Sequence, residues 1–203
     1  PALISTLCQV AYALTCLHRH GWAHLGLRPD RVLLSRPVTV LDLSYATRIG
    51  EKPQWSFYHA GYSPPEILKE QPVDGRADVY SVGALLYHAI NGQPIPETGP
   101  ELSMWKPPEP VPGVPQILRR CLGEVDTRYS SMQELHEALK GLRQRLGQVT
   151  AYEIEGATTI GLEPTRTTNQ DAYAYLTGTT ATEQGQDSWA VLCVADGMGG
   201  MEA

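Results

Sequence analysis

The sequence lacks any run of about 18 consecutive apolar residues, and a helix needs about 20 of them to cross a bilayer. We therefore expect no membrane-spanning segment. CxxC pairs are also absent, so the ligand pairs of a structural zinc site are missing. The four cysteines are Cys8, Cys16, Cys121 and Cys193. Because most of them have apolar neighbours in the sequence, we expect buried, reduced thiols and a cytoplasmic location.

Basic residues are almost absent from the last part of the chain. Residues 147–203 hold one, Arg166, against eight acidic residues, whereas residues 1–146 hold 15 basic and 14 acidic residues. The balances of −7 and +1 add up to the net charge of −6 and indicate two units of different chemistry. The acidic unit suits cations and is a poor nucleic-acid binder, so we expect no nucleic-acid partner.

Internal repeats are missing too, and the prolines make the one low-complexity tract. At 203 residues the chain has room for one large or two small domains, taking ~150 residues per domain. It opens at Pro1 directly into an amphipathic helical pattern, so we expect no signal peptide. Because its last residues, MEA, break off inside a motif, we expect a piece of a longer protein.

Helical patterns dominate the first 146 residues. Leucine and valine at alternating spacings of four and three predict a helix over 3–17 that ends before Gly21. Residues 77–91 are apolar on nearly all sides, which predicts a helix in the middle of a domain, and Gly92 follows as a stop.

Prolines interrupt this pattern before it resumes. Residues 93–115 hold eight of the sixteen prolines, which predicts irregular structure on the surface. Further helices are predicted over 115–123 and 130–146, where Ser130 and Gln133 would form a capping box.

Strand patterns are short at first and dominate after Gly147. The runs RVLL (31–34) and VTVL (38–41) predict a small hairpin, and the aperiodic segment 43–63 predicts a surface loop. Later strands are predicted over 150–156, 172–176 and 189–195. We expect the domain boundary near 146–150.

Four stretches follow one another in the order found in one family. They are HLGLRPDR at 24–31, DLS at 42–44, PPE at 64–66 and DVYSVGALLY at 78–87. Protein kinases carry H-R-D-L-x-x-x-N, D-F-G, A-P-E and an Asp that opens a hydrophobic helix in these places. Residues 1–146 therefore resemble the C-lobe of a eukaryotic-like Ser/Thr protein kinase, without its N-lobe.

The resemblance implies an intact scaffold. Glu66 matches the A-P-E glutamate, which pairs with an arginine, here Arg128. Asp78 matches the aspartate that holds the catalytic-loop backbone, and His24 matches the loop histidine, which packs and hydrogen-bonds. A lone buried carboxylate is costly, so positions of this kind require such partners. The other histidines are expected to be ordinary.

The same resemblance implies that catalytic groups are missing. Phosphoryl transfer needs a carboxylate that accepts the proton of the substrate hydroxyl, and Gly26 stands in its place. Arg31 occupies the position of an Mg²⁺ ligand, a cation where a cation should bind. Asp42 matches the second metal ligand. A role in loop geometry would explain an aspartate at this position equally well.

Further positions also differ from the family pattern. Arg28 replaces a lysine that steadies the transferred phosphate, and His59 stands at the threonine of the substrate-docking loop. The Gly-rich loop, the β3 lysine and the helix-C glutamate precede this segment in kinases and are not in the chain. We therefore expect a pseudokinase in which no nucleotide site closes, and the sequence leaves ATP binding open.

The acidic tail resembles the start of a metal-dependent protein phosphatase of the type 2C (PPM) family. PTRTTNQDAYAY (164–175) and WAVLCVADGMGGMEA (189–203) match R-x-x-N-[EQ]-D and D-G-x-G-G. The implied fold is the first strands of an α-β-β-α sandwich. The fold class expected for the chain is α+β multidomain, with a linker and first strand at 147–157 and a truncated phosphatase part at 158–203.

By this second resemblance Asp196 bridges two Mn²⁺ or Mg²⁺ ions and the Gly197 carbonyl ligates one of them. Arg166 grips the substrate phosphate, Asp171 holds the attacking metal-bound water, and Gln170 lies in the outer shell of a metal. The site would be incomplete in this chain. The alternative is that DGMGG is a strand-to-turn glycine cluster and Arg166 a solvated surface residue.

Three hypotheses of function result. The first is a signalling protein whose pseudokinase half binds a partner or controls a phosphatase that acts on phosphoserine and phosphothreonine in phosphoprotein substrates. The second is an active Ser/Thr kinase with a rearranged site, which needs another carboxylate near Gly26. Asp30 is the only local candidate, and we expect it to point from the wrong position of the loop. The third is a non-catalytic interaction module.

Overall fold

The structure is a computed structural model that describes most of the chain. The described residues are 2–53, 58–69, 71–100, 113–146, 152, 154–159, 169, 171–181 and 186–196. The elements, with η for a 3-10 helix, are α1 (Ala2–Arg19), β1 (Trp22–Ala23), η1 (Pro29–Arg31), β2 (Val32–Leu33), β3 (Thr39–Val40), β4 (Thr47–Arg48), η2 (Pro65–Lys69), α2 (Arg76–Asn91), α3 (Val114–Leu122), η3 (Val125–Thr127), α4 (Met132–Leu146), β5 (Ala172–Ala181) and β6 (Gln186–Ala195).

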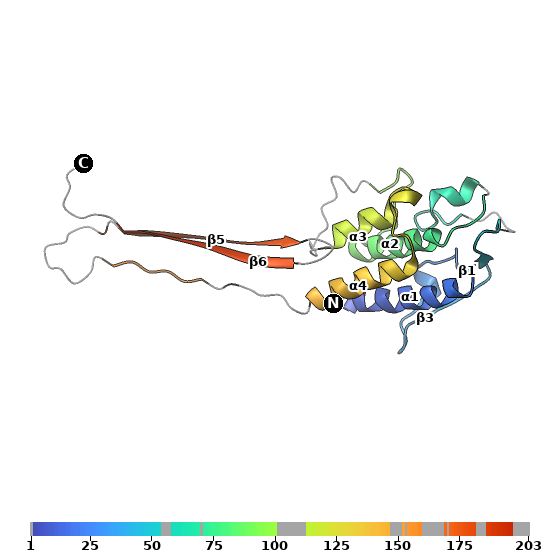
Figure 1. The fold of residues 1–203 in the computed structure, drawn as a ribbon, viewed down its shortest axis with the longest axis horizontal. Helices are drawn as coiled ribbons and strands as arrows, with labels where there is room; N and C mark the ends of the chain where they lie inside the picture. The colour runs from blue at the N-terminus through green and yellow to red at the C-terminus, as the bar shows by residue number, and fades with distance from the viewer. Residues whose placement is uncertain are drawn as a thin grey trace.

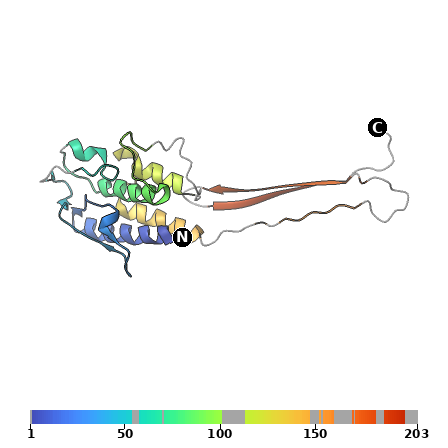
Figure 2. The same ribbon diagram turned by 180° about the vertical axis from the view of Figure 1, so that it is seen from behind.

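The four α-helices form one body, in which α2 contacts each of the other three. In both views α1 runs beside α4, and α2 lies beside α3 (Figures 1 and 2). Residues 77–86 of α2 are all buried, which explains why this helix has no polar face in its sequence. The prediction of a central helix over 77–91 is confirmed.

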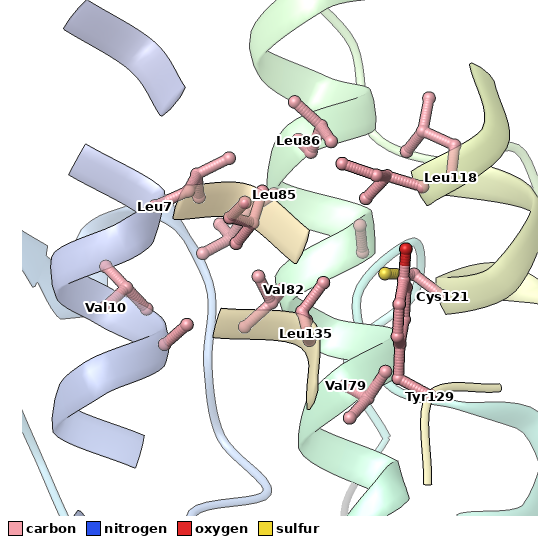
Figure 3. Packing of buried hydrophobic residues seen from close by; sticks show 14 of the residues in the cluster. Leu7, Val10, Val79, Val82, Leu85, Leu86, Leu118, Cys121, Tyr129 and Leu135 are labelled. Carbon is pink, nitrogen blue, oxygen red and sulfur yellow. The ribbon is translucent and has the colours of Figure 1, made fainter. Parts of the chain in front are cut away.

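The core joins side chains from all four helices. Figure 3 shows α2 side chains between those of α1 and those of α3, with α4 contributing from the same side as α1. The labelled members are Leu7, Val10, Val79, Val82, Leu85, Leu86, Leu118, Cys121, Tyr129 and Leu135. Burial of a Leu or Val side chain contributes about 1.5–3 kcal/mol, so this contact zone accounts for much of the stability of the helical body.

Two glycines end helices as the sequence predicts. Gly21 follows α1 with a φ of 80°, and Gly92 follows α2 with a φ of 71°, where its N–H donates to the His88 carbonyl at 2.8 Å. Both conformations lie in the left-handed region, which glycine enters without a Cβ clash.

The cap of α4 lies one residue later than predicted. The Ser131 hydroxyl accepts the N–H of Glu134 at 3.2 Å, and the Glu134 carboxylate accepts the N–H of Ser130 at 2.8 Å. The predicted pair Ser130 and Gln133 is therefore wrong. The charged carboxylate of Glu134 is a stronger acceptor than the Gln133 amide and sets the register of the helix start.

The small strands lie near the start of the lobe. The predicted hairpin over 31–34 and 38–41 is confirmed as β2 and β3, with Val32 opposite Val40. Strand β4, which pairs with β1, lies inside the segment 43–63 that was predicted to be loop. A two-residue strand has no measurable period, so the sequence pattern could not reveal it.

After α4, the described elements are β5 and β6, which form one long antiparallel hairpin. In Figures 1 and 2 this hairpin extends away from the helical body. It contains the predicted strands 172–176 and 189–195. Of the predicted strand 150–156, the described residues 152 and 154–156 are in no strand. The described residues do not form an α-β-β-α sandwich, and the domain boundaries stay predictions.

The cysteines are free, as predicted, but they differ in exposure. Cys8 and Cys121 are buried, Cys16 is half-buried, and Cys193 on β6 is exposed, so the prediction of burial is wrong for Cys193. Burial raises the pKa of the Cys8 thiol. Across the described part of the chain, none of the helices combines the length and apolar character that a membrane crossing requires. The cytoplasmic location stays a prediction.

Helix α2 packs closely on α3 at Gly83. A Cβ built there would lie 2.4 Å from Cys121 Cβ and 3.1 Å from Leu122 Cδ2. Alanine favours a helix by about 1 kcal/mol over glycine, but overpacking a core costs about 1–3 kcal/mol. We expect Gly83→Ala to lower the free energy of unfolding by about 1–2 kcal/mol, measured by urea denaturation.

Gly141 of α4 provides the matched control. Its added Cβ would meet Arg145 Nη1 at 3.1 Å, the far end of a flexible side chain that can move away. We expect Gly141→Ala to raise the free energy of unfolding by up to about 1 kcal/mol. Equal effects of the two substitutions would show that the close approach of α2 to α3 is not tight.

Candidate active site

One buried carboxylate holds the segment 24–31 to the core. Asp78, in the first turn of α2, is 0% exposed and accepts hydrogen bonds from the backbone N–H of His24 at 2.7 Å and of Leu25 at 2.8 Å. His18 near the end of α1 donates from Nε2 to the same carboxylate at 2.8 Å. The three donors compensate the desolvation of the carboxylate and join α1, the segment 24–31 and α2.

The backbone at Leu25 needs this support. Its φ of 61° lies in the left-handed region, which a residue with a Cβ rarely adopts, and its side chain is buried. The adjacent His24 ring donates from Nε2 to the Leu41 carbonyl at 3.1 Å and accepts the Gly26 N–H on Nδ1 at 3.2 Å. The neutral Nε2–H tautomer satisfies both contacts and joins the segment to the chain before Asp42.

The expected ion pair between Glu66 and Arg128 is present. Its two oxygen–nitrogen contacts are 2.5 and 3.0 Å long, and the Arg128 side chain is 1% exposed. Arg128 also donates from Nε to the Gly123 carbonyl at 2.8 Å, and its guanidinium lies 4.9 Å from the centre of the Tyr80 ring. Burial raises the pKa of Tyr80 to about 12, so it is a neutral ring against this cation.

Gly26, which was predicted to stand in the place of the catalytic base, has no room for a side chain. A Cβ built on Gly26 would lie 2.6 Å from Cδ2 of the Tyr45 ring, which is shorter than any real contact of this kind. Tyr45 therefore occupies the space that an aspartate side chain would enter. An exchange of Gly26 alone cannot restore a carboxylate here without moving the Tyr45 ring.

A guanidinium pairs with Asp42, the predicted metal ligand. Arg31 Nη1 is 2.6 Å from Oδ2 of Asp42, and the other carboxylate oxygen accepts both the N–H of Ser44, at 3.0 Å, and its hydroxyl. The Ser44 hydroxyl and then its N–H lower the pKa of Asp42, and Arg31 adds to this. Both oxygens of Asp42 are engaged, so this donor set does not fit a divalent cation.

A second basic side chain lies beside this pair. Arg28 donates from Nε to Asp30 at 2.7 Å and from Nη1 to the His59 ring at 3.0 Å. Burial, followed by the charge of Arg28, lowers the pKa of His59, so the ring is a neutral acceptor near pH 7. On this side of the site the Tyr45 and His59 rings pack edge to face, with their centroids 5.4 Å apart.

The structure describes part of the predicted metal site in the tail. Because Ala172 pairs with Ala195, Asp171 and Asp196 lie at the same end of the β5–β6 hairpin. The predicted residues Arg166, Gln170 and Gly197 lie outside the described residues. Within the described part of the chain, no three His, Cys, Asp or Glu side chains are placed to hold a metal ion.

Two residues of the site were missed from the sequence. His18 was taken for an ordinary histidine, although it is a third donor to Asp78, 60 residues away. Tyr45 was not considered, although it fills the space next to Gly26. Neither contact follows from spacing or composition, because each depends on how distant segments pack.

Comparison with known proteins agrees with this geometry. The sequence model of the protein kinase domain matches residues 2–149. The chain therefore belongs to the protein kinase domain family.

The chain is also similar to parts of protein kinases from several organisms. It is 32% identical to the serine/threonine-protein kinase Pkn1 of Myxococcus xanthus over 167 residues, which cover 68% of this chain and 24% of that protein. It is 33% identical to the serine/threonine-protein kinase dkf-1 of Caenorhabditis elegans, over 66% of this chain and 22% of that protein. It is 32% identical to the Wee1-like protein kinase of Oryza sativa, over 49% of this chain and 20% of that protein. The chain thus spans about a quarter or less of these relatives.

These findings correct the predicted enzyme class. The prediction of a metal-dependent phosphatase is wrong, because the matching family and these relatives are protein kinases, which are transferases. The physical reason for the error is that the Asp-Gly motif is short and not specific to one family. A strand that ends in Asp-Gly and glycines is a common way to leave a sheet, and short motifs of this kind match by chance.

The Glu66–Arg128 pair should be a main support of the lobe. Glu66→Gln removes the counter-charge of a buried guanidinium while preserving the size of the side chain. Loss of one partner of a buried pair typically costs about 3–5 kcal/mol, and we expect about 2–4 here because the Glu66 side chain is 25% exposed. Urea denaturation measures the change.

The exposed pair of Lys140 and Glu137, 3.4 Å apart, provides the control, with side chains 45% and 54% exposed. Lys140→Gln should cost no more than about 0.5 kcal/mol. If Glu66→Gln costs no more than Lys140→Gln, the buried pair does not support the fold.

Proposed function

We propose that this chain is the C-lobe of a serine/threonine protein kinase, which transfers phosphate from ATP to hydroxyl groups of protein substrates. The observation that carries the proposal is the buried frame around the segment 24–31. Asp78 fixes the loop backbone, and the ion pair of Glu66 and Arg128 fixes the neighbouring segment. A lobe of this kind provides the protein-substrate side of a phosphotransfer site.

The base of such a reaction would have to differ from that of other kinases. Within the segment 24–31, Asp30 is the one carboxylate, and its side chain is 60% exposed. It is therefore accessible to a substrate hydroxyl, although Arg28 and Arg31 now lie beside it. No step of this proposal uses a metal ion at Asp42.

A second candidate function is favoured by the altered site itself. Tyr45 fills the space next to Gly26, and Arg31 pairs with Asp42. These contacts support a kinase-like module that binds protein partners without transferring phosphate. The predicted pseudokinase belongs to this candidate, and a regulatory partner protein would then bind the lobe.

One assay separates the two candidates. In the full-length protein with radiolabelled ATP and a general protein substrate, the kinase proposal predicts measurable transfer that falls about 100-fold or more in Asp30→Asn, because a general base contributes about 10²–10⁴-fold. The matched control is Asp126→Asn, since the Asp126 side chain is 96% exposed and lies beyond α3. Its rate should equal that of the wild type.

The second candidate predicts a different result. Neither the wild type nor Asp30→Asn would then transfer phosphate above a sample lacking enzyme. Transfer that is equal in the wild type and Asp30→Asn would exclude Asp30 as the base and leave the kinase proposal without its catalytic residue.

A further inference from the structure

The protein kinase family implies a divalent cation at Asp42, but the surroundings of Asp42 already contain a positive charge. Arg31 Nη1 lies 2.6 Å from Oδ2, and Ser44 donates two hydrogen bonds to Oδ1. The side chains of Arg31 and Asp42 are 28% and 21% exposed, so the pair is mostly shielded from water. A guanidinium has five donors and no acceptor, and so it cannot ligate a metal.

We infer that the Arg31 guanidinium is a built-in replacement for the metal ion, and that the contact between the segments 24–31 and 42–44 forms without any divalent cation. The inference goes beyond the proposed function, because it holds whether or not the protein transfers phosphate.

The backbone brings the two partners close together. Strands β2 and β3 pair with Val32 opposite Val40, and the Leu41 N–H donates to the Arg31 carbonyl at 2.8 Å. By this register Arg31 lies opposite Leu41, one step beyond the ladder, and Asp42 is the residue that follows Leu41. The backbone therefore holds Arg31 and Asp42 close to each other.

The conformation of Asp42 also depends on its partners. Its φ of 62° lies in the left-handed region, where aspartate is tolerated when its side chain bonds locally. Ser44 supplies that local bond and Arg31 the charge. A metal ion would have to displace the guanidinium, meet its positive charge, and find oxygen ligands that this donor set lacks.

The test measures divalent-cation binding on the full-length protein. Thermal unfolding is followed during a titration with MnCl₂ or MgCl₂ at constant ionic strength. The readout is the shift in Tm of a protein minus the shift in Tm of the same protein carrying Asp42→Asn. In the wild type we expect this Asp42-dependent difference to be zero within error, at all concentrations and after EDTA treatment.

A gain-of-binding variant makes the test two-sided. Arg31→Asn places an amide oxygen beside Asp42, and we expect a saturable rise in Tm with Mn²⁺ that is lost in the double variant Arg31→Asn/Asp42→Asn. Arg31→Gln serves as a second variant of closer size. Arg36→Asn, at an exposed arginine between β2 and β3, is the control and should behave as the wild type.

Two results would overturn the inference. One is a saturable, Asp42-dependent rise in the Tm of the wild type, which would show that a metal ion displaces Arg31. The other is the absence of any rise in both Arg31 variants, which would show that the guanidinium is not what prevents binding.

Discussion

The buried carboxylate of Asp78 is the interaction on which the rest of the lobe depends. It is fully buried, so it is tolerable only because three N–H groups donate to it, two from the backbone of His24 and Leu25 and one from the ring of His18. Its place in the first turn of α2 adds the favourable field of the helix N-terminus. The left-handed backbone at Leu25, the orientation of His24 and the approach of α1 to α2 all follow from this one group.

In this chain, the buried residues that hold the site in place differ from the residues at the predicted catalytic positions. The frame consists of buried groups with complete hydrogen bonding, such as Asp78 and Arg128, and its loss would leave charges unpaired in the interior. Of the predicted catalytic positions, Gly26 is buried, and Arg31 and Asp42 are partly exposed. Tyr45 fills the space next to Gly26 and Arg31 pairs with Asp42, and the frame is present beside both contacts.

The sequence predicted the helices well, because burial imposes a period that can be read directly. It missed the pairing of β1 with β4, since two residues carry no period, and it placed the cap of α4 one residue early. The pairs made by Asp78 and by Glu66 could be predicted through family resemblance, whereas His18 and Tyr45 could not, because their contacts arise from packing between distant segments. The phosphatase prediction failed for a different reason, because it depended on short motifs that match by chance. Asp171 and Asp196 do lie at one end of a hairpin, but nearness of two carboxylates does not define an enzyme class.

The charges of the segment 28–31 also decide what this lobe could do as a kinase. Arg28 holds Asp30 at 2.7 Å, so a reaction that used Asp30 as its base would first have to release this carboxylate from the guanidinium. Arg28 has a second acceptor in the neutral ring of His59, 3.0 Å away, and it can keep that contact when Asp30 leaves. Arg31 has its own partner in Asp42 and gains little from Asp30, 3.4 Å away. The release of Asp30 therefore breaks its ion pairs with Arg28 and Arg31, in which the Asp30 side chain is 60% exposed. Ion pairs with an exposed partner are weak, so local electrostatics oppose a rearranged site less than the loss of the usual base suggests.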